Sequence, residues 1–239
     1  MSDVDNRPPC PGNPRDFVWV RTRNGGHWRH KRGTYKKAVL NHVLSTNARL
    51  TKHTNDAASR LMNHLRPHLE GMQPGRSYVH VAGRLKQAYK QNGAFDFSKL
   101  LDFDFQKECP LRAFLDLNAN IAENGNRVQL DVPVSRRMLN VAGQDITQLR
   151  FQLILVYGDV TQDGGLNDSM HESDLLSVDD QEQCCSLSVE LPEAQPWMLL
   201  LRLSCLHNDG SDALRQRHGM RVIRVGGSAP AGSQRIDLD

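Results

Sequence analysis

The spacing of apolar residues changes near Gly93, and this change limits the possible fold classes more than any other feature of the sequence. Between Tyr35 and Leu65 apolar residues recur three or four positions apart, a period that predicts an amphipathic helix. Thr34 is the expected N-cap, while the polar stretch TKHTND leaves one long helix and two shorter ones equally open. A further helix is predicted from Ser77, as its cap, to Gly93 just past its end.

Beyond Gly93 the period falls toward two, which is the period of a strand with one buried face. RVQLDVPV alternates cleanly, and QLRFQLILVYGDV is longer and more apolar. The segments CSLSVEL, WMLLLRLSCL and MRVIRV predict three more strands, and PLRAFLDLNANI predicts another. Because no helical pattern separates these strands, an antiparallel, jelly-roll-like β-sandwich is expected and a parallel α/β fold is disfavoured.

A β-hairpin is expected before the helices, where FVWVRTR and HWRHKR flank the turn-forming residues Asn24, Gly25 and Gly26. The chain is therefore expected to be α+β and to have four parts. These are an extended, proline-bearing arm (1–16), a basic hairpin and helical module (17–93), an acidic antiparallel β-sandwich (94–227) and a flexible tail (228–239).

The net charge of +3 conceals an uneven division of charge along the chain. Residues 1–92 hold 17 Lys or Arg against five acids, a net charge of +12. The remaining residues hold 13 Lys or Arg against 22 acids, a net charge of −9. Two anionic partners suit the basic part equally well on charge alone: nucleic acid, or the acidic part of another copy of this chain.

The basic charge is densest in VWVRTRNGGHWRHKRGTYKK, residues 18–37, which hold seven Lys or Arg and two His. Cations and rings in this arrangement can follow a phosphate backbone while the rings stack on bases, or the tryptophans can anchor the hairpin to a neighbouring helix. The candidate partner- or phosphate-binding residues are Arg21, Arg23, Arg29, Lys31, Arg32, Lys36 and Lys37. The candidate anchoring or stacking residues are Trp19, Trp28 and Tyr35.

Motifs for catalysis are missing from the sequence. There is no P-loop, dinucleotide-binding glycine motif, serine-nucleophile elbow or H-E-x-x-H zinc motif. FDFSKLLDFDF, residues 95–105, alternates Asp with Phe and is expected to be a linker or edge strand with a buried aromatic side. Neither an enzymatic activity nor a cofactor is therefore expected.

Metal sites are not expected either. His27 and His30 would lie on opposite faces of a strand, and Pro67 would interrupt the helix that could align His64 with His68. The acidic segment GDVTQDGGLNDSMHESD, residues 158–174, lacks the ligand order of a calcium loop. It is expected to be a flexible, solvated loop.

The five cysteines are an odd number without a C-x-x-C pair, so a disulfide framework is not expected. The neighbours Cys184 and Cys185 would point to opposite faces of a strand. The sequence has no secretory signal and no apolar stretch long enough to span a membrane. The expected compartment is therefore the reducing cytoplasm, without a membrane partner.

NGGHWRHKRGTYKK, followed by NARLTKHTNDAASRLMNHLRPHL, resembles a loose group of uncharacterised proteins from Bacteroidetes. Members of that group open with a basic aromatic hairpin, continue into a polar helix with a late Leu-Arg, and often end in a β-rich domain. The resemblance implies the two-part architecture and a bacterial origin, but neither an activity nor a catalytic residue. This chain departs from the group in lacking a Pro-Ala-Phe-like helix entry.

Two functions are expected from these features. The leading hypothesis is a non-enzymatic, self-assembling structural protein whose basic part docks on the acidic β-sandwich of a neighbouring copy, giving a homo-oligomer. The alternative is a coat-like or packaging protein that binds nucleic acid through the basic part. Salt is expected to weaken either contact because it screens charge.

Overall fold

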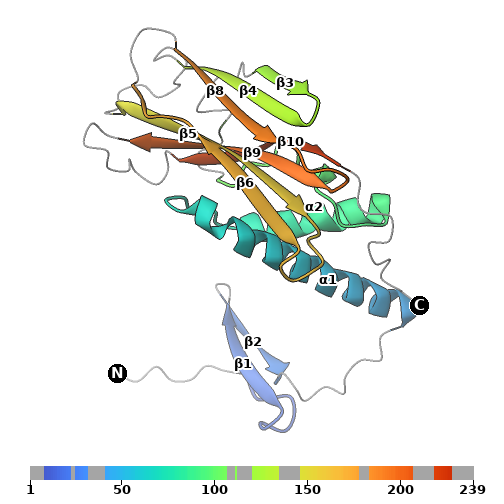
Figure 1. The fold of residues 1–239 in the computed structure, drawn as a ribbon. Helices are drawn as coiled ribbons and strands as arrows, with labels where there is room; N and C mark the ends of the chain where they lie inside the picture. Colours follow the sequence, from blue (N-terminus) through green and yellow to red (C-terminus); the bar gives the residue numbers. More distant parts are fainter. Residues whose placement is uncertain are drawn as a thin grey trace. The chain divides into compact units, whose positions relative to one another are not determined.

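The computed structural model describes residues 8–22, 25–31, 41–106, 111, 120–134, 146–177, 183–206 and 218–227. The chain divides into two compact units, Met1–Ser45 and Thr46–Asp239. The first unit contains a β-hairpin, and the second contains two larger β-sheets and most of the helical structure (Figure 1).

Strands β1 (Phe17–Thr22) and β2 (Gly25–His30) form the hairpin of the first unit. They pair antiparallel along their whole length, and two residues connect them. Gly25 has a φ of 124°, a backbone conformation that residues with a side chain rarely adopt, which explains a glycine at the start of β2. The predicted hairpin is present, but Gly25 and Gly26 belong to the second strand and not to the turn.

Helix α1 (His42–Leu65) is a single helix, so the polar stretch TKHTND does not break it. Thr51 and Thr54 each donate a hydroxyl to the backbone carbonyl four residues earlier, which satisfies these side chains inside the helix. The helix starts after Asn41, whose Oδ1 accepts a hydrogen bond from the backbone N–H three residues later. The predicted N-cap, Thr34, lies outside the described residues.

The 3-10 turn η1 (Arg66–Leu69) follows α1 directly, and helix α2 (Ser77–Asn92) comes after a short loop. Gly93 ends α2 in the left-handed conformation, with a φ of 72°, as predicted. Ser77 does not cap the helix, so that prediction is wrong. Its hydroxyl is buried and lies 2.6 Å from the carbonyl oxygen of Phe105, to which it donates.

Five strands form the larger sheet, in the order β10–β9–β5–β6 with β7 also paired to β5. Every pairing is antiparallel. The strands are β5 (Gln148–Gly158), β6 (Leu166–Glu172), β7 (Leu176–Ser177), β9 (Trp197–Leu206) and β10 (Gly219–Gly226).

A smaller antiparallel sheet has the strand order β3–β4–β8. Its strands are β3 (Asn120–Asn124), β4 (Arg127–Val134) and β8 (Gln183–Glu190). The predicted strand RVQLDVPV coincides with β4, and WMLLLRLSCL coincides with β9.

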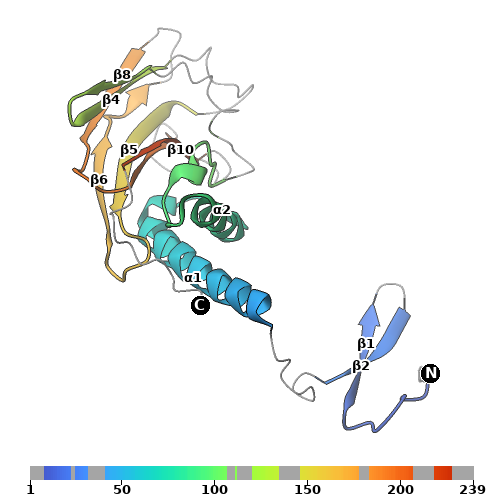
Figure 2. The same cartoon turned by 90° about the vertical axis from the view of Figure 1, so that its right-hand side faces the viewer.

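The second unit has three layers: the smaller sheet, the larger sheet, and helices α1 and α2 (Figures 1 and 2). One hydrophobic core lies between the two sheets and the other between the larger sheet and the helices. On β5, Leu153 and Leu155 belong to the first core, while Ile154 and Val156 belong to the second. Burial on both faces explains the unbroken apolar runs of β5 and β9, which a sheet with one wet face would not need.

Residues 95–105 run beside β10 and close one edge of the helix-side core. Their large apolar side chains are all buried except that of Leu101, which is 42% exposed. The segment includes the 3-10 turn η2 (Ser98–Leu100) and an isolated antiparallel bridge between Asp104 and Arg221. The predicted buried aromatic side is confirmed.

Two segments depart from the prediction. Residues 158–174 are not one loop, because β6 occupies residues 166–172 and pairs with β5. The chain reverses between the two strands in a turn where Asp159 Oδ1 accepts the backbone N–H of Thr161. Within PLRAFLDLNANI, Leu111 is helical and the last two residues belong to β3, while residues 110 and 112–119 lie outside the described part of the chain.

The fold class is α+β with antiparallel sheets after two helices, as predicted. Among the described residues, no helix is both long enough and apolar enough to cross a membrane.

Candidate anion-binding surface of the N-terminal hairpin

Aromatic rings occupy one face of the hairpin. The ring centroids of Phe17 and His30 lie 4.0 Å apart, and those of Trp19 and Trp28 lie 5.3 Å apart with their planes at 65°. Such edge-to-face contact is favourable between aromatic rings. Gly26 leaves the space that the Trp19 ring fills, because a side-chain carbon at Gly26 would collide with that ring.

The described part of the N-terminal arm packs on this aromatic face. The Trp28 indole N–H donates to the carbonyl oxygen of Pro8 at 2.8 Å. A side-chain carbon on Gly12 would lie 2.8 Å from Cε2 of Phe17, so the arm backbone passes close to that ring. The two tryptophans therefore contact each other and, through Trp28, the arm.

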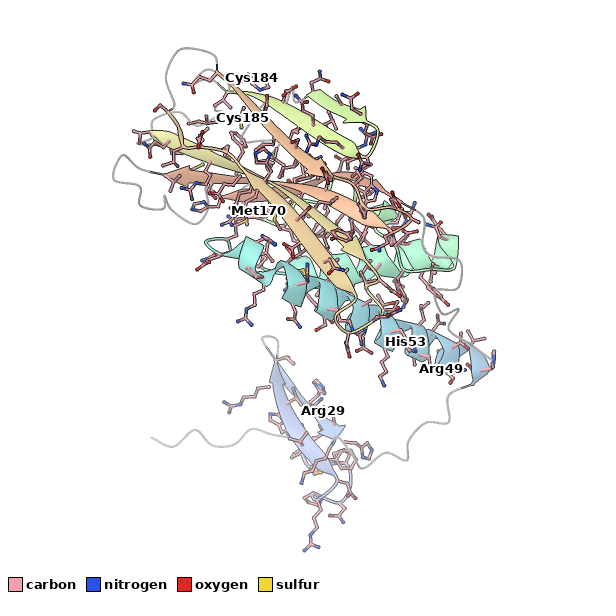
Figure 3. The ribbon with its side chains drawn as sticks, in the orientation of Figure 1. Arg29, Arg49, His53, Met170, Cys184 and Cys185 are labelled. Atoms are coloured by element: carbon pink, nitrogen blue, oxygen red, sulfur yellow. The ribbon has the colours of Figure 1, made fainter. Side chains whose placement is uncertain are left out.

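The opposite face carries cationic groups at alternate positions of β2. His27 and Arg29 lie opposite the two valines of β1, and both are exposed (Figure 3 labels Arg29). Lys31 follows at the next alternate position and is also exposed. Its backbone N–H donates to the carbonyl of Asp16 at 2.7 Å, which continues the strand pairing. We call His27, Arg29 and Lys31 the basic face.

The remaining predicted residues are divided between the aromatic face and undescribed positions. Arg21 lies opposite Gly26 on the aromatic face and is exposed. His30 lies on that face as well, so His27 and His30 point to opposite sides of the strand, as predicted. The predicted site residues outside the described part of the chain are Arg23, Arg32, Tyr35, Lys36 and Lys37.

In the second unit, basic and acidic residues that are far apart in the sequence meet. Arg60 on α1 pairs with Asp163 in the β5–β6 turn. The Nε2 atoms of His64 and His68 lie 3.0 Å and 3.2 Å from the two carboxylate oxygens of Asp168 on β6. Part of the charge division seen along the sequence is therefore cancelled inside the unit.

Pro67 interrupts the helix, as predicted, because α1 ends at Leu65 and Pro67 lies in η1. The two histidines nevertheless contact one carboxylate, that of Asp168. Pro67 stands at the start of η1, which tolerates a proline, so the chain continues and brings both rings to one carboxylate. Burial lowers the pKa of His68, and the neighbouring Asp168 carboxylate opposes this by raising it. Among the described residues, no group of three or more His, Cys, Asp or Glu is arranged to hold a metal ion.

Arg221 on β10 binds the two aspartates of residues 95–105. Its Nη2 lies 2.8 Å from Asp102 Oδ1, and its Nη1 lies 2.8 Å from Asp104 Oδ2. Burial raises the pKa of Asp104, although Arg221 acts to lower it. The aspartates of this segment therefore fasten it to β10, which is a structural task.

An open groove of about 680 Å³ lies where α1 passes through η1 into the following loop. Met62, Leu69 and Met72 line it together with Arg66 and Glu70, which are its two ionisable residues. The described cysteines form no disulfide. The adjacent Cys184 and Cys185 on β8 are exposed and buried respectively, as the prediction of opposite faces requires (Figure 3).

Sequence reasoning did not foresee the packing of the arm on the hairpin or the contact of α1 with β6. The prolines of the arm indicated an extended chain, and an extended chain can still lie on an aromatic face. The signal for the second contact was present in the unbroken apolar runs of β5 and β9. These runs required a cover on both faces of the larger sheet, and α1 is part of that cover.

No protein-family model matches this chain, and no curated protein matches it. Among solved structures, the N-terminal domain of PorA is similar at 11% sequence identity, over 40% of this chain and 74% of that one. The TM-score of 0.22 is too low to support an argument about fold or function. The comparisons assign the chain to no family, and the resemblance to the Bacteroidetes group stays a prediction.

Proposed function

We propose that this protein is a non-enzymatic binding protein whose first unit docks on nucleic acid through the hairpin. The observation that carries the proposal is the distribution of charge between the two units. Residues 1–45 hold nine Lys or Arg and three Asp, a net charge of +6. Residues 46–239 hold 21 Lys or Arg and 24 acids, a net charge of −3.

Nucleic acid suits the first unit better than another copy of the second unit does. Duplex DNA carries one negative charge for about every 1.7 Å of its axis. The −3 of the second unit is spread over most of the chain, and two of its carboxylates, Asp163 and Asp168, already contact α1. A dense polyanion therefore offers the basic face far more charge within its reach.

Two further features fit this proposal. The described groove has only one acid and one base in its lining, which gives little support for a catalytic site there. We also propose the cytoplasm as the compartment, because the described cysteines form no disulfide. The resemblance to the Bacteroidetes group adds no activity to the proposal.

Fluorescence anisotropy of a labelled duplex of about 20 base pairs, titrated with the full chain across a salt series, tests the proposal. We expect log affinity to fall linearly with log salt, with a slope of about −0.9 for each phosphate contact. Changing Arg21, Arg29 and Lys31 together to Gln should remove about two or three phosphate contacts, and the slope should become shallower by the corresponding amount.

The matched control neutralises three exposed cations of the helical part, Lys52, Arg76 and Lys90, to Gln. It changes the net charge equally and should bind almost like the wild type. Equal losses of affinity in the two triple variants would show that the hairpin is not the binding site. No anisotropy change at the lowest salt would reject nucleic-acid binding altogether.

Self-assembly is the second candidate, and strand β6 is the feature that favours it. β6 ends the strand order of the larger sheet, and its Met170 side chain is 47% exposed between two acidic residues (Figure 3). Edge strands of this kind can pair with a strand of another chain. Light scattering after size exclusion across a salt series tests it, and a monomer at every salt concentration would exclude it.

A further inference from the structure

We infer that the hairpin binds the phosphodiester backbone through its basic face and does not stack on bases through its tryptophans. The inference rests on the proposed function and goes further, because it selects one face of the hairpin and one chemical part of nucleic acid. Backbone contacts position a protein on nucleic acid but carry no sequence information. Binding is then independent of sequence.

The tryptophans are engaged inside the first unit. Trp19 covers Gly26 and meets Trp28 edge to face. Trp28 uses its single N–H donor on the carbonyl of Pro8. The edge-to-face contact and the packing of Trp19 on Gly26 already occupy part of the ring surface that a stacked base would need, whereas free stacking platforms offer open ring faces.

The basic face has the geometry of a backbone reader. His27 and Arg29 occupy alternate residues of β2, where such residues are spaced by about 6.7 Å, and Lys31 follows at the next alternate position just beyond the end of the strand. Arg29 and Lys31 supply a guanidinium and an ammonium group, and both residues are exposed. Arg29 can in addition hold one phosphate with two parallel N–H donors.

An abasic oligonucleotide separates the two modes of binding. The full chain is titrated into a labelled single strand of about 20 thymidines and into a strand of equal length whose sugars carry no bases. We expect dissociation constants that agree within about twofold at the same salt, because the phosphates are unchanged. Base stacking would instead weaken binding to the abasic strand by tenfold or more.

Two single variants test which face is used, because Arg21 and Arg29 lie on opposite faces of the hairpin. Arg29→Gln and Arg21→Gln remove the same charge from the same unit. We expect Arg29→Gln to weaken binding about threefold or more and Arg21→Gln to do so clearly less. The reverse order would overturn the assignment of the basic face.

Trp28→Phe tests the task of the indole N–H while an aromatic ring is kept. We expect trypsin to cut after Arg15 faster, because the arm loses its hydrogen bond through Pro8, while affinity for both strands is retained.

The titrations of the wild-type chain distinguish failure of the inference from failure of the proposed function. Binding to the thymidine strand but not to the abasic strand would overturn the inference and leave the proposed function standing. Binding to neither strand would overturn the inference and the proposed function, and equal binding to the two strands supports them.

Discussion

Asp168 joins two layers of the second unit through a pair of histidines. It lies on β6, and its carboxylate oxygens contact His64 at the end of α1 and His68 in η1. His68 has only 13% of its side chain exposed, and its pKa is lowered mainly by burial. Arg202 and His64 also act to lower this pKa, while Asp168 acts to raise it. This balance makes the contact sensitive to acid.

We predict that acid destabilises the second unit through His68. The unfolded chain protonates this residue near pH 6.5, and the folded chain does so only at lower pH. Stability is therefore lost as pH falls below about 6.5 toward the folded pKa, where the unfolded state binds more protons. Urea unfolding between about pH 7.5 and 5 should show that the free energy of unfolding falls with pH. We call the steepness of this fall the acid slope, and His68→Gln should reduce it.

Asp168→Asn should have the opposite effect on the acid slope. Without the carboxylate, the pKa of His68 falls further, so the stability lost on acidification increases. The matched control is His80→Gln, which changes an exposed histidine on α2. An unchanged slope in both His68→Gln and Asp168→Asn would contradict the prediction.

At the scale of elements, α2 contains two glycines with opposite tasks. Gly83 lies within the helix and is exposed, and apart from the nearby backbone of α2 no atom lies within 4 Å of where its side-chain carbon would be. Gly93 ends the helix with a left-handed φ of 72°. A glycine inside a helix costs stability, whereas a glycine in the left-handed conformation avoids strain.

The same substitution should therefore have opposite effects at these two positions. Gly83→Ala should stabilise the protein by about 1 kcal/mol, raising Tm by about 2–4 °C. Gly93→Ala should destabilise it by about 1–2 kcal/mol. Differential scanning calorimetry measures both changes in Tm. Changes of the same sign would show that helix propensity and capping do not control the stability of α2.

At the scale of the whole molecule, both hydrophobic cores belong to the second unit. The buried residues that form them begin at Leu50 and continue through α1, α2 and the two sheets. The first unit relies instead on its paired strands, its aromatic rings and the arm. The two units thus have separate sources of stability.

Deleting residues 2–40 should remove nucleic-acid binding but leave the thermal transition of the second unit within about 2 °C of the wild type. The deletion keeps Asn41, which caps α1. Leu85→Ala, at a fully buried position, is the control for a damaged core and should cost about 3 kcal/mol. A similar loss in the deletion variant would show that the second unit depends on the first.

Local patterns in the sequence were sufficient for the elements of the fold. The alternation in RVQLDVPV and the glycine at position 93 predicted β4 and the end of α2, because pleating and backbone sterics act between near neighbours. The hairpin and the faces of His27 and His30 follow from the same reasoning. β6 was missed because most of its residues are polar, as an edge strand allows, so its sequence resembles a loop.

The sequence by itself thus determined the α+β class, the helices, most strands and the density of basic charge in the hairpin. Only the tertiary structure decided that helices cover the second face of the larger sheet, that His64 and His68 share Asp168, and that the arm packs on the tryptophans. The physical reason is range. Periodicity and turn chemistry act over a few residues, whereas layer packing and ion pairing join residues about a hundred positions apart. A local pattern can therefore show that a face must be covered, but not which residues cover it.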